Sequence, residues 1–224
     1  MSKALLLIGS PKLGRSTSES LGSYFIEKLN ERGVETESIS VYRLLRSEGG
    51  MEQLNEAVDK ADVLVLSFPL YADALPAGLV HALTSIADHR KASASPRKQG
   101  LVAVSNCGFP ESRHIDTAIA VCRQFAGETG IDWLGGLALG AGGSLDGRPL
   151  AKAGGMVRNA IAAFDLAASD VAEGRPISDE AVAMMARPMM PSWMYTLFGN
   201  LGWRLQARKL ATKKKLNDRP LQGE

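Results

Sequence analysis

The chain has 224 residues, of which 45% are hydrophobic and 22% are charged, and its formal net charge is +2. This length suits one large α/β domain with a sizeable core, and no apolar run approaches the roughly 18 residues that a membrane span requires. Two cysteines are too few for a disulfide scaffold or a Cys-x-x-Cys metal site, and no small-residue cleavage pattern follows the first apolar run. We therefore expect a cytoplasmic protein without a metal site.

Charge is unevenly distributed along the chain. The segment from Arg204 onward holds seven basic and two acidic residues, a net charge of +5, whereas residues 1–203 have a net charge of −3. A mildly acidic body does not favour a nucleic-acid surface. The sequence therefore predicts a body that binds no nucleic acid, followed by a basic tail.

Apolar strands alternate with helical stretches along the chain. We expect strands at 3–9, 34–41, 62–68, 100–106 and 132–140, and helices at 16–32, 51–60, 77–89, 112–128 and 150–172. The first strand is continuously apolar, as central parallel strands are, and Ser16 with Glu19 fits a capping box at the start of the first helix. Five such units predict an α/β fold with a doubly wound, five-stranded parallel sheet and helices on both faces.

Three loops of unusual composition leave the carboxyl ends of the predicted strands. They are Ser10–Ser18, Pro69–Pro76 and Asn106–Glu111. Ligands of open parallel sheets bind outside the carboxyl ends of the strands, at the point where the strand order reverses. We therefore expect the three loops to lie on one rim of the sheet and to form one binding site.

The first loop, "GSPKLGRSTSESL", is a near-match to the Walker A pattern. Arg15 replaces its lysine, Pro11 lacks an N–H group, and the third strand does not end in an aspartate that would help to hold Mg²⁺. A dinucleotide-binding Gly-x-Gly-x-x-Gly is also absent. Hydroxyls and free N–H groups at a helix N-terminus hold a single phosphate without a metal. The candidates here are Ser10, Ser16, Thr17 and Ser18, with charge added by Lys12 and Arg15.

The segments "GSPKLGRSTSESL", "PLYADALPAGL" and "SNCGFPE" resemble the three flavin-contacting loops of the flavodoxin-like NAD(P)H-dependent FMN reductase family, and the resemblance covers about residues 3–170. It implies a flavodoxin-like fold, bound FMN, and NADPH or NADH as co-substrate. It places at the FMN phosphate Ser10, Lys12, Ser16, Thr17 and Ser18. It places along one side of the flavin Pro69, Leu70, Tyr71, Ala72 and Asp73, and along the other Asn106, Cys107, Gly108 and Phe109.

The activity that this resemblance implies is an FMN-dependent NAD(P)H oxidoreductase. Electrons pass from the nicotinamide through FMN to a small acceptor: a quinone, a nitro or azo compound, a metal ion or free flavin. The flavin does the chemistry, so no side-chain acid or base is obligatory, and Tyr71 and His114 are only weak catalytic candidates. The alternative is a flavodoxin-type electron-transfer or flavin-binding protein without its own NAD(P)H turnover. The family also implies a homo-oligomer.

Several of these residues have structural interpretations as well. We expect Asp73 to hold its loop through an Asx-type turn, Pro76 to begin the next helix, and Cys107 to be an inert thiol. The pair Gly142–Gly143 either lets the backbone approach a ligand or forms a turn.

Residues 177–224 form a C-terminal helical extension beyond the predicted domain at 1–176, and a helix starts near Ser178. After Pro191 a stripe of apolar side chains shares one helical face ahead of the basic tail: Trp193, Leu197, Leu201 and Leu205. The stripe packs on the chain's own body or on a second subunit, or it lies in a membrane interface. Gly199 and Gly202 weaken it as an isolated helix, so the two protein partners are favoured.

Overall fold

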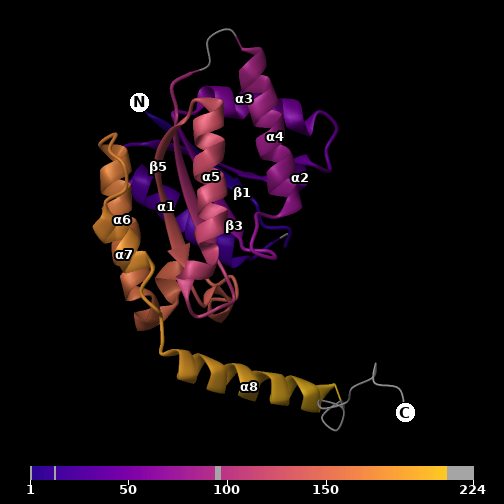
Figure 1. The fold of residues 1–224 in the computed structure, drawn as a ribbon, viewed down its shortest axis with the longest axis vertical. Helices are drawn as coiled ribbons and strands as arrows, with labels where there is room; N and C mark the ends of the chain where they lie inside the picture. The colour runs from indigo at the N-terminus through magenta and orange to yellow at the C-terminus, as the bar shows by residue number, and fades with distance from the viewer. Residues whose placement is uncertain (1, 13, 94–96, 211–224) are drawn as a thin grey trace. The chain divides into compact units, whose positions relative to one another are not determined.

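Five parallel strands form the centre of the fold. The computed structural model describes residues 2–12, 14–93 and 97–210. The strands are β1 (Lys3–Ile8), β2 (Glu35–Ser40), β3 (Val63–Pro69), β4 (Gly100–Asn106) and β5 (Asp132–Leu139). They pair in parallel in the order β2-β1-β3-β4-β5 (Figure 1). The predicted five-stranded parallel sheet is confirmed, and its strand order is the flavodoxin-like one.

The position of each strand in the sheet explains its composition. The central strands β1, β3 and β4 are buried along most of their length, because helices cover both of their faces. β2 lies at an edge, and its sequence, ETESIS, has no buried residue. The edge strand is therefore polar while the central strands are apolar.

The helices divide between the two faces of the sheet (Figure 1). Those on one face are α1 (Thr17–Asn30), α6 (Arg158–Ala172) and α7 (Asp179–Met185). Those on the other face are α3 (Gly50–Lys60), α4 (Ala77–Ala92) and α5 (Asp116–Thr129). Alternate residues of β1 point into opposite cores: Leu6 packs with the first set, and Leu5 and Leu7 pack with the second.

The structure corrects three of the predicted elements. The helix predicted at 150–172 is interrupted: the 3₁₀ segments η3 (Leu150–Lys152) and η4 (Gly154–Val157) precede α6, and the two glycines at 154 and 155 are poor helix formers. The helix predicted from residue 112 begins as η1 (Ser112–Ile115). The second strand ends at Ser40, because Val41 is buried as the first residue of a short helix, α2 (Val41–Leu44), which was not predicted.

The chain divides into two compact units, Met1–Met189 and Met190–Glu224. α7 packs against α6 and β5 and so belongs to the first unit, whereas the sequence prediction ended the core domain at residue 176. The second unit contains α8 (Ser192–Lys209). The part of the predicted basic tail beyond Leu210 lies outside the described residues. No helix in the described part of the chain combines the length and hydropathy that crossing a membrane requires.

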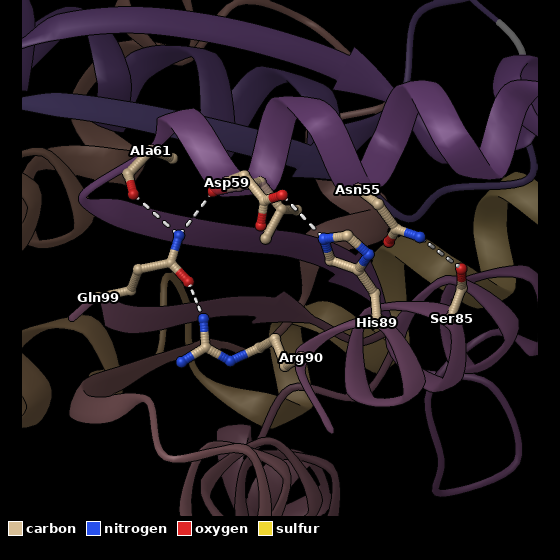
Figure 2. Close-up of polar contacts among 8 residues, drawn as sticks. Asn55, Asp59, Ala61, Ser85, His89, Arg90 and Gln99 are labelled. Carbon is tan, nitrogen blue, oxygen red and sulfur yellow. Dashed lines mark hydrogen bonds and ion pairs between the residues drawn. The ribbon is translucent and has the colours of Figure 1, made fainter. Parts of the chain in front are cut away.

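A buried arginine joins several elements at the amino-terminal end of the sheet (Figure 2). Arg90, near the end of α4, is only 5% exposed, and burial lowers the pKa of its guanidinium below the ordinary value. It donates hydrogen bonds to Oε1 of Gln99 and, at 2.9 Å, to the carbonyl of Thr129. Gln99 in turn donates to the carbonyls of Val58 and Ala61, at 2.6 and 2.8 Å. These bonds connect α3, α4 and α5 at the start of β4.

We expect Arg90→Met to lower the free energy of unfolding by about 2–3 kcal/mol, because it leaves buried carbonyl oxygens without donors. Urea denaturation measures this change. Lys91→Met removes the same charge from the next, exposed position and is expected to cost less than about 0.5 kcal/mol. Equal losses in the two variants would contradict the role assigned to Arg90.

Candidate functional site

The structure brings the three predicted loops together at one rim of the sheet. The loops follow β1, β3 and β4, which are neighbours. At the first junction the N–H of Gly9 donates to the carbonyl of Ser67 at 2.8 Å, and at the second the N–H of Leu70 donates to the carbonyl of Asn106 at 2.8 Å. The loops are thus attached to one another by backbone hydrogen bonds as soon as the strands end.

The first loop leads directly into the N-terminus of α1. Ser16 is the N-cap residue, with extended backbone, and its hydroxyl accepts a hydrogen bond from the N–H of Glu19 at 3.1 Å. The N–H groups of Thr17 and Ser18 begin the helix and have no partner within it. Together with the helix dipole, such N–H groups attract an anion.

The hydroxyls that the sequence places at the phosphate differ in whether they already form hydrogen bonds within the protein. Ser10 is 4% exposed, and its hydroxyl has no hydrogen-bond partner among the described residues. Thr17 donates to the carbonyl of Gly142 at 3.0 Å. Ser18 is 1% exposed and accepts a bond from the side-chain amide of Asn106 at 2.9 Å. The Ser10 hydroxyl is therefore free to bond to a ligand, whereas the Ser18 hydroxyl is used in a hydrogen bond that joins the first loop to the third.

Positive charge lies beside this loop. Lys12 is exposed, and its ammonium group lies 3.7 Å from the carboxylate of Asp146. It contributes to a small cavity of about 160 Å³ whose other lining residues are Ile8, Gly14, Glu19, Ser38, Ser40 and Arg43. Sequence analysis missed Arg43 and the two β2 serines. In the sequence, the one feature that could have indicated them is that two serines and an arginine occur near the end of the second strand.

The second loop contains a tight turn with unusual backbone geometry. Tyr71 and Ala74 exchange two backbone hydrogen bonds of 3.0 Å each. The residues between them, Ala72 and Asp73, have φ values of 46° and 60°, as the two central residues of a type I′ turn do. No hydrogen bond to the Asp73 carboxylate occurs within the described residues, so the predicted Asx-type turn is wrong, and backbone bonds hold the loop.

The turn presents Tyr71 to solvent. Its side chain is 50% exposed, while Pro69 ends β3 in register with Asn106, and Leu70 packs against the core. The next helix, α4, begins at Ala77, directly after Pro76, as predicted. Of this loop, the aromatic ring of Tyr71 is thus the part best placed to meet a ligand.

The third loop combines buried and exposed residues. Asn106 and Cys107 are buried, whereas Gly108 is exposed and Phe109 is 52% exposed. The ring of Phe109 lies against the imidazole of His114, with centroids 4.4 Å apart. The imidazole is also 3.9 Å from the carboxylate of Glu111. His114 therefore supports the Phe109 ring, and the loop offers that ring at the rim.

Neither cysteine has the environment of a reactive thiolate. Burial raises the pKa of Cys107, whose Sγ lies 3.5 Å from the carbonyl of Phe109. Burial in the core raises the pKa of Cys122 to about 12. At neutral pH both remain protonated thiols, as the sequence interpretation of Cys107 expected.

The glycine-rich loop after β5 packs against the first and third loops. The N–H of Gly142 donates to the carbonyl of Cys107 at 2.8 Å, and a Cβ on Gly142 would lie 2.8 Å from Oδ1 of Asn106. Gly147, with a φ of +68°, comes equally close to the backbone of Arg15. The sequence left open whether Gly142 approaches a ligand or forms a turn. The structure shows the turn: Gly142–Ser144 form a 3₁₀ segment, η2, which also packs closely against the other loops.

A larger cavity, of about 360 Å³, lies between α1 and the segment that follows Gly147. It is lined by residues that include Arg15, Ser20, Tyr24 and Leu150. Its lining includes none of the second or third loop. It therefore lies beside the rim, on the outer side of the first loop.

The donors at the rim suit a phosphate monoester. Ser10 supplies a hydroxyl without a partner in the described part of the chain, α1 supplies N–H groups, and Lys12 supplies positive charge. Tyr71 and Phe109, on the two neighbouring loops, expose aromatic rings that suit a flat apolar ligand. These residues fit the phosphate and ring system of a flavin mononucleotide.

The family described as having a flavodoxin-like fold matches residues 2–153, more than half of the chain. The chain belongs to this family, in agreement with the resemblance carried by its three loop segments. No curated protein matches the sequence.

Solved structures share the fold at low sequence identity. An FMN-dependent NADH-azoreductase from Bacillus anthracis, in complex with FMN, is 16% identical with a TM-score of 0.56, covering 77% of this chain and 100% of its own. An NADH:FMN oxidoreductase in its apo form is 14% identical with a TM-score of 0.57, covering 85% and 97%. An NADPH-quinone reductase from P. pentosaceus is 19% identical with a TM-score of 0.53, covering 75% and 98%.

The positive φ of Ala72 leads to a prediction about stability. An alanine in this region is strained by about 1 kcal/mol, and glycine is not. We expect Ala72→Gly to be neutral or slightly stabilising, and Ala74→Gly, in the same turn, to be destabilising by about 0.5–1 kcal/mol. Thermal denaturation of both variants measures the difference. Equal destabilisation by the two substitutions would show that Ala72 is unstrained.

Proposed function

We propose that the protein is an FMN-dependent oxidoreductase that takes electrons from NADPH or NADH and passes them to a small acceptor. The observation that carries the proposal is the start of α1. There the hydroxyl of Ser10, which no described residue engages in a hydrogen bond, and the helix N–H groups adjoin two loops that expose aromatic rings. A flavin mononucleotide needs both features, because one end is an anion and the other is a flat ring system.

In this proposal, different residues of the first loop contribute hydrogen bonds and charge to a bound phosphate. The Ser10 hydroxyl and the N–H groups of Thr17 and Ser18 donate hydrogen bonds, and Lys12 adds positive charge. Ser16 caps the helix and keeps those N–H groups at the rim. Ser18 and Asn106 bond to each other beneath it and hold the first and third loops at a constant separation.

Tyr71 and Phe109 provide apolar surface for the ring system. When bound, FMN supplies the redox chemistry by accepting hydride from a nicotinamide and returning electrons to an acceptor. The protein's part is to orient the ring and limit access to it. No proton transfer by Tyr71 or His114 is required, and the Cys107 thiol takes no part.

The structural neighbours support the finer parts of the proposal. They include proteins named for azo, quinone and FMN reduction, with NADH in some names and NADPH in another. The proposal therefore keeps quinones, nitro or azo compounds, metal ions and free flavin as acceptor classes, and both nicotinamide nucleotides as donors. It includes a cytoplasmic homo-oligomer.

The phosphate role of the first loop is tested by comparing FMN with riboflavin, which lacks the phosphate. We expect Ser10→Ala to weaken FMN binding by about tenfold or more, since a hydrogen bond to a charged group contributes about 1.5–3 kcal/mol, and to leave riboflavin binding unchanged. Quenching of flavin fluorescence during titration measures both affinities.

The matched control is Ser23→Ala, which removes an exposed hydroxyl from the second turn of α1. The double variant Ser16→Ala with Thr17→Ala is expected to show a larger FMN-specific loss, with some loss of helix stability because Ser16 is the cap. If Ser10→Ala weakens FMN and riboflavin equally, the loop does not bind the phosphate.

The activity is tested by anaerobic reduction. Purified protein loaded with FMN is expected to be yellow, and NADPH or NADH is expected to bleach it at a catalytic rate. A yellow protein that neither nucleotide reduces would favour the electron-carrier alternative. A protein that does not bind FMN but binds ATP with Mg²⁺ would overturn both the oxidoreductase and the electron-carrier hypothesis. It would support the Walker interpretation of the first loop.

A further inference from the structure

α8 has an apolar face that its own unit does not bury. Six apolar side chains recur along the helix at spacings of three and four residues: Trp193, Met194, Leu197, Phe198, Leu201 and Leu205. At about 3.6 residues per turn they share one side of the helix with Arg204 and Arg208, whereas Thr196, Gln206 and one further exposed aromatic residue, Trp203, lie on the other side. α8 is the only helix of its unit within the described residues, and five of the six side chains are about half or more exposed, Met194 being partly buried.

A helix of this composition needs a partner to be stable. It has 18 residues, and Gly199 and Gly202 lie in its interior. Each internal glycine lowers helix stability by roughly 1 kcal/mol relative to alanine. Isolated helices of about 15 residues are only marginally stable in water, even without such glycines. The contiguous aromatic and aliphatic side chains therefore indicate a binding surface.

Charge identifies the kind of partner. No aspartate or glutamate occurs between Glu180 and Asp218, whereas α8 ends with three basic residues, Arg204, Arg208 and Lys209, and three lysines follow in the sequence. The body, residues 1–203, has a net charge of only −3. An anionic bilayer offers a continuous layer of negative charge to these basic residues, whereas the 22 acidic residues of the body are nearly balanced by 19 basic ones.

We propose that α8 binds the surface of an anionic lipid bilayer. The helix lies in the plane of the interface, with its apolar face at the boundary between headgroups and acyl chains. Arg204 and Arg208 extend their long side chains from the helix to the headgroups. The helix lies on the bilayer and does not cross it, in keeping with its hydropathy.

The experiment uses the full-length protein and vesicles of phosphatidylcholine, with or without phosphatidylglycerol. We expect the protein to sediment with the anionic vesicles at low salt, to be released by high salt, and to remain in solution with neutral vesicles. Far-UV circular dichroism should show a gain in helicity on binding. Neither measurement requires flavin or turnover, so the result is independent of the proposed activity.

Two variants separate the apolar face from the charge. We expect Leu197→Ser with Leu201→Ser to lower vesicle partitioning at least tenfold, because two leucines no longer enter the acyl region. The triple variant Arg204→Gln, Arg208→Gln and Lys209→Gln is expected to lower vesicle partitioning on the order of 100-fold, at about fivefold per charge. The matched control removes the same charge from exposed positions of the body and is expected to change partitioning only slightly; its substitutions are Arg46→Gln, Lys60→Gln and Lys91→Gln.

Three results would overturn the proposal. The first is full-length protein that stays in solution with anionic vesicles, and the second is a body control that loses as much binding as the α8 variant. The third is a lower melting temperature of the body, or dissociation of an oligomer, in Leu197→Ser with Leu201→Ser without any change in vesicle binding. That result would assign the apolar face to the chain's own body or to a second copy.

Discussion

The buried hydrogen bond from the Asn106 amide to the Ser18 hydroxyl is the contact on which the rim of the sheet depends. It is 2.9 Å long and joins the end of β4 to the first turn of α1. Between them lies β3, whose Ser67 hydroxyl donates to the carbonyl of Ser18 at 2.7 Å. Leaving buried polar groups unpaired costs free energy. Any loop arrangement that breaks these hydrogen bonds is therefore disfavoured relative to the observed one.

That network separates supporting residues from those that face a ligand. Ser18, Asn106 and Cys107 are buried and bond to protein groups. The Ser10 hydroxyl has no partner among residues 2–12, 14–93 and 97–210, and the rings of Tyr71 and Phe109 stay half exposed. The first loop and the two neighbouring loops are therefore held at a separation that protein contacts determine before any ligand arrives. Such preorganisation would favour the proposed flavin site, since the loops then need little further ordering when a ligand binds.

Much of the fold could be predicted from local pattern. The continuous apolar runs of β1, β3 and β4 predict central parallel strands, and Ser16 with Glu19 predicts the start of α1, where the cap bond is present. One failure, the helical turn at Val41, occurs where packing decides, because Val41 is buried. The interruption before α6 has a local signal that the apolar periodicity does not register, the glycines at 154 and 155.

By itself the sequence determined the order and type of the main elements, the identity of the three loops and the basic end of the chain, because each follows from neighbouring residues. Only the tertiary structure decided that the Ser10 hydroxyl has no partner among the described residues, that Ala72 adopts a positive φ, and that the loop at Gly142 packs against Asn106. The packing of Gly142 arises between segments far apart in sequence, whereas backbone bonds between Tyr71 and Ala74 close the turn at Ala72. A serine in a loop has the same local signal whether it caps a helix, supports a strand or faces a ligand, and only its neighbours in space distinguish the three.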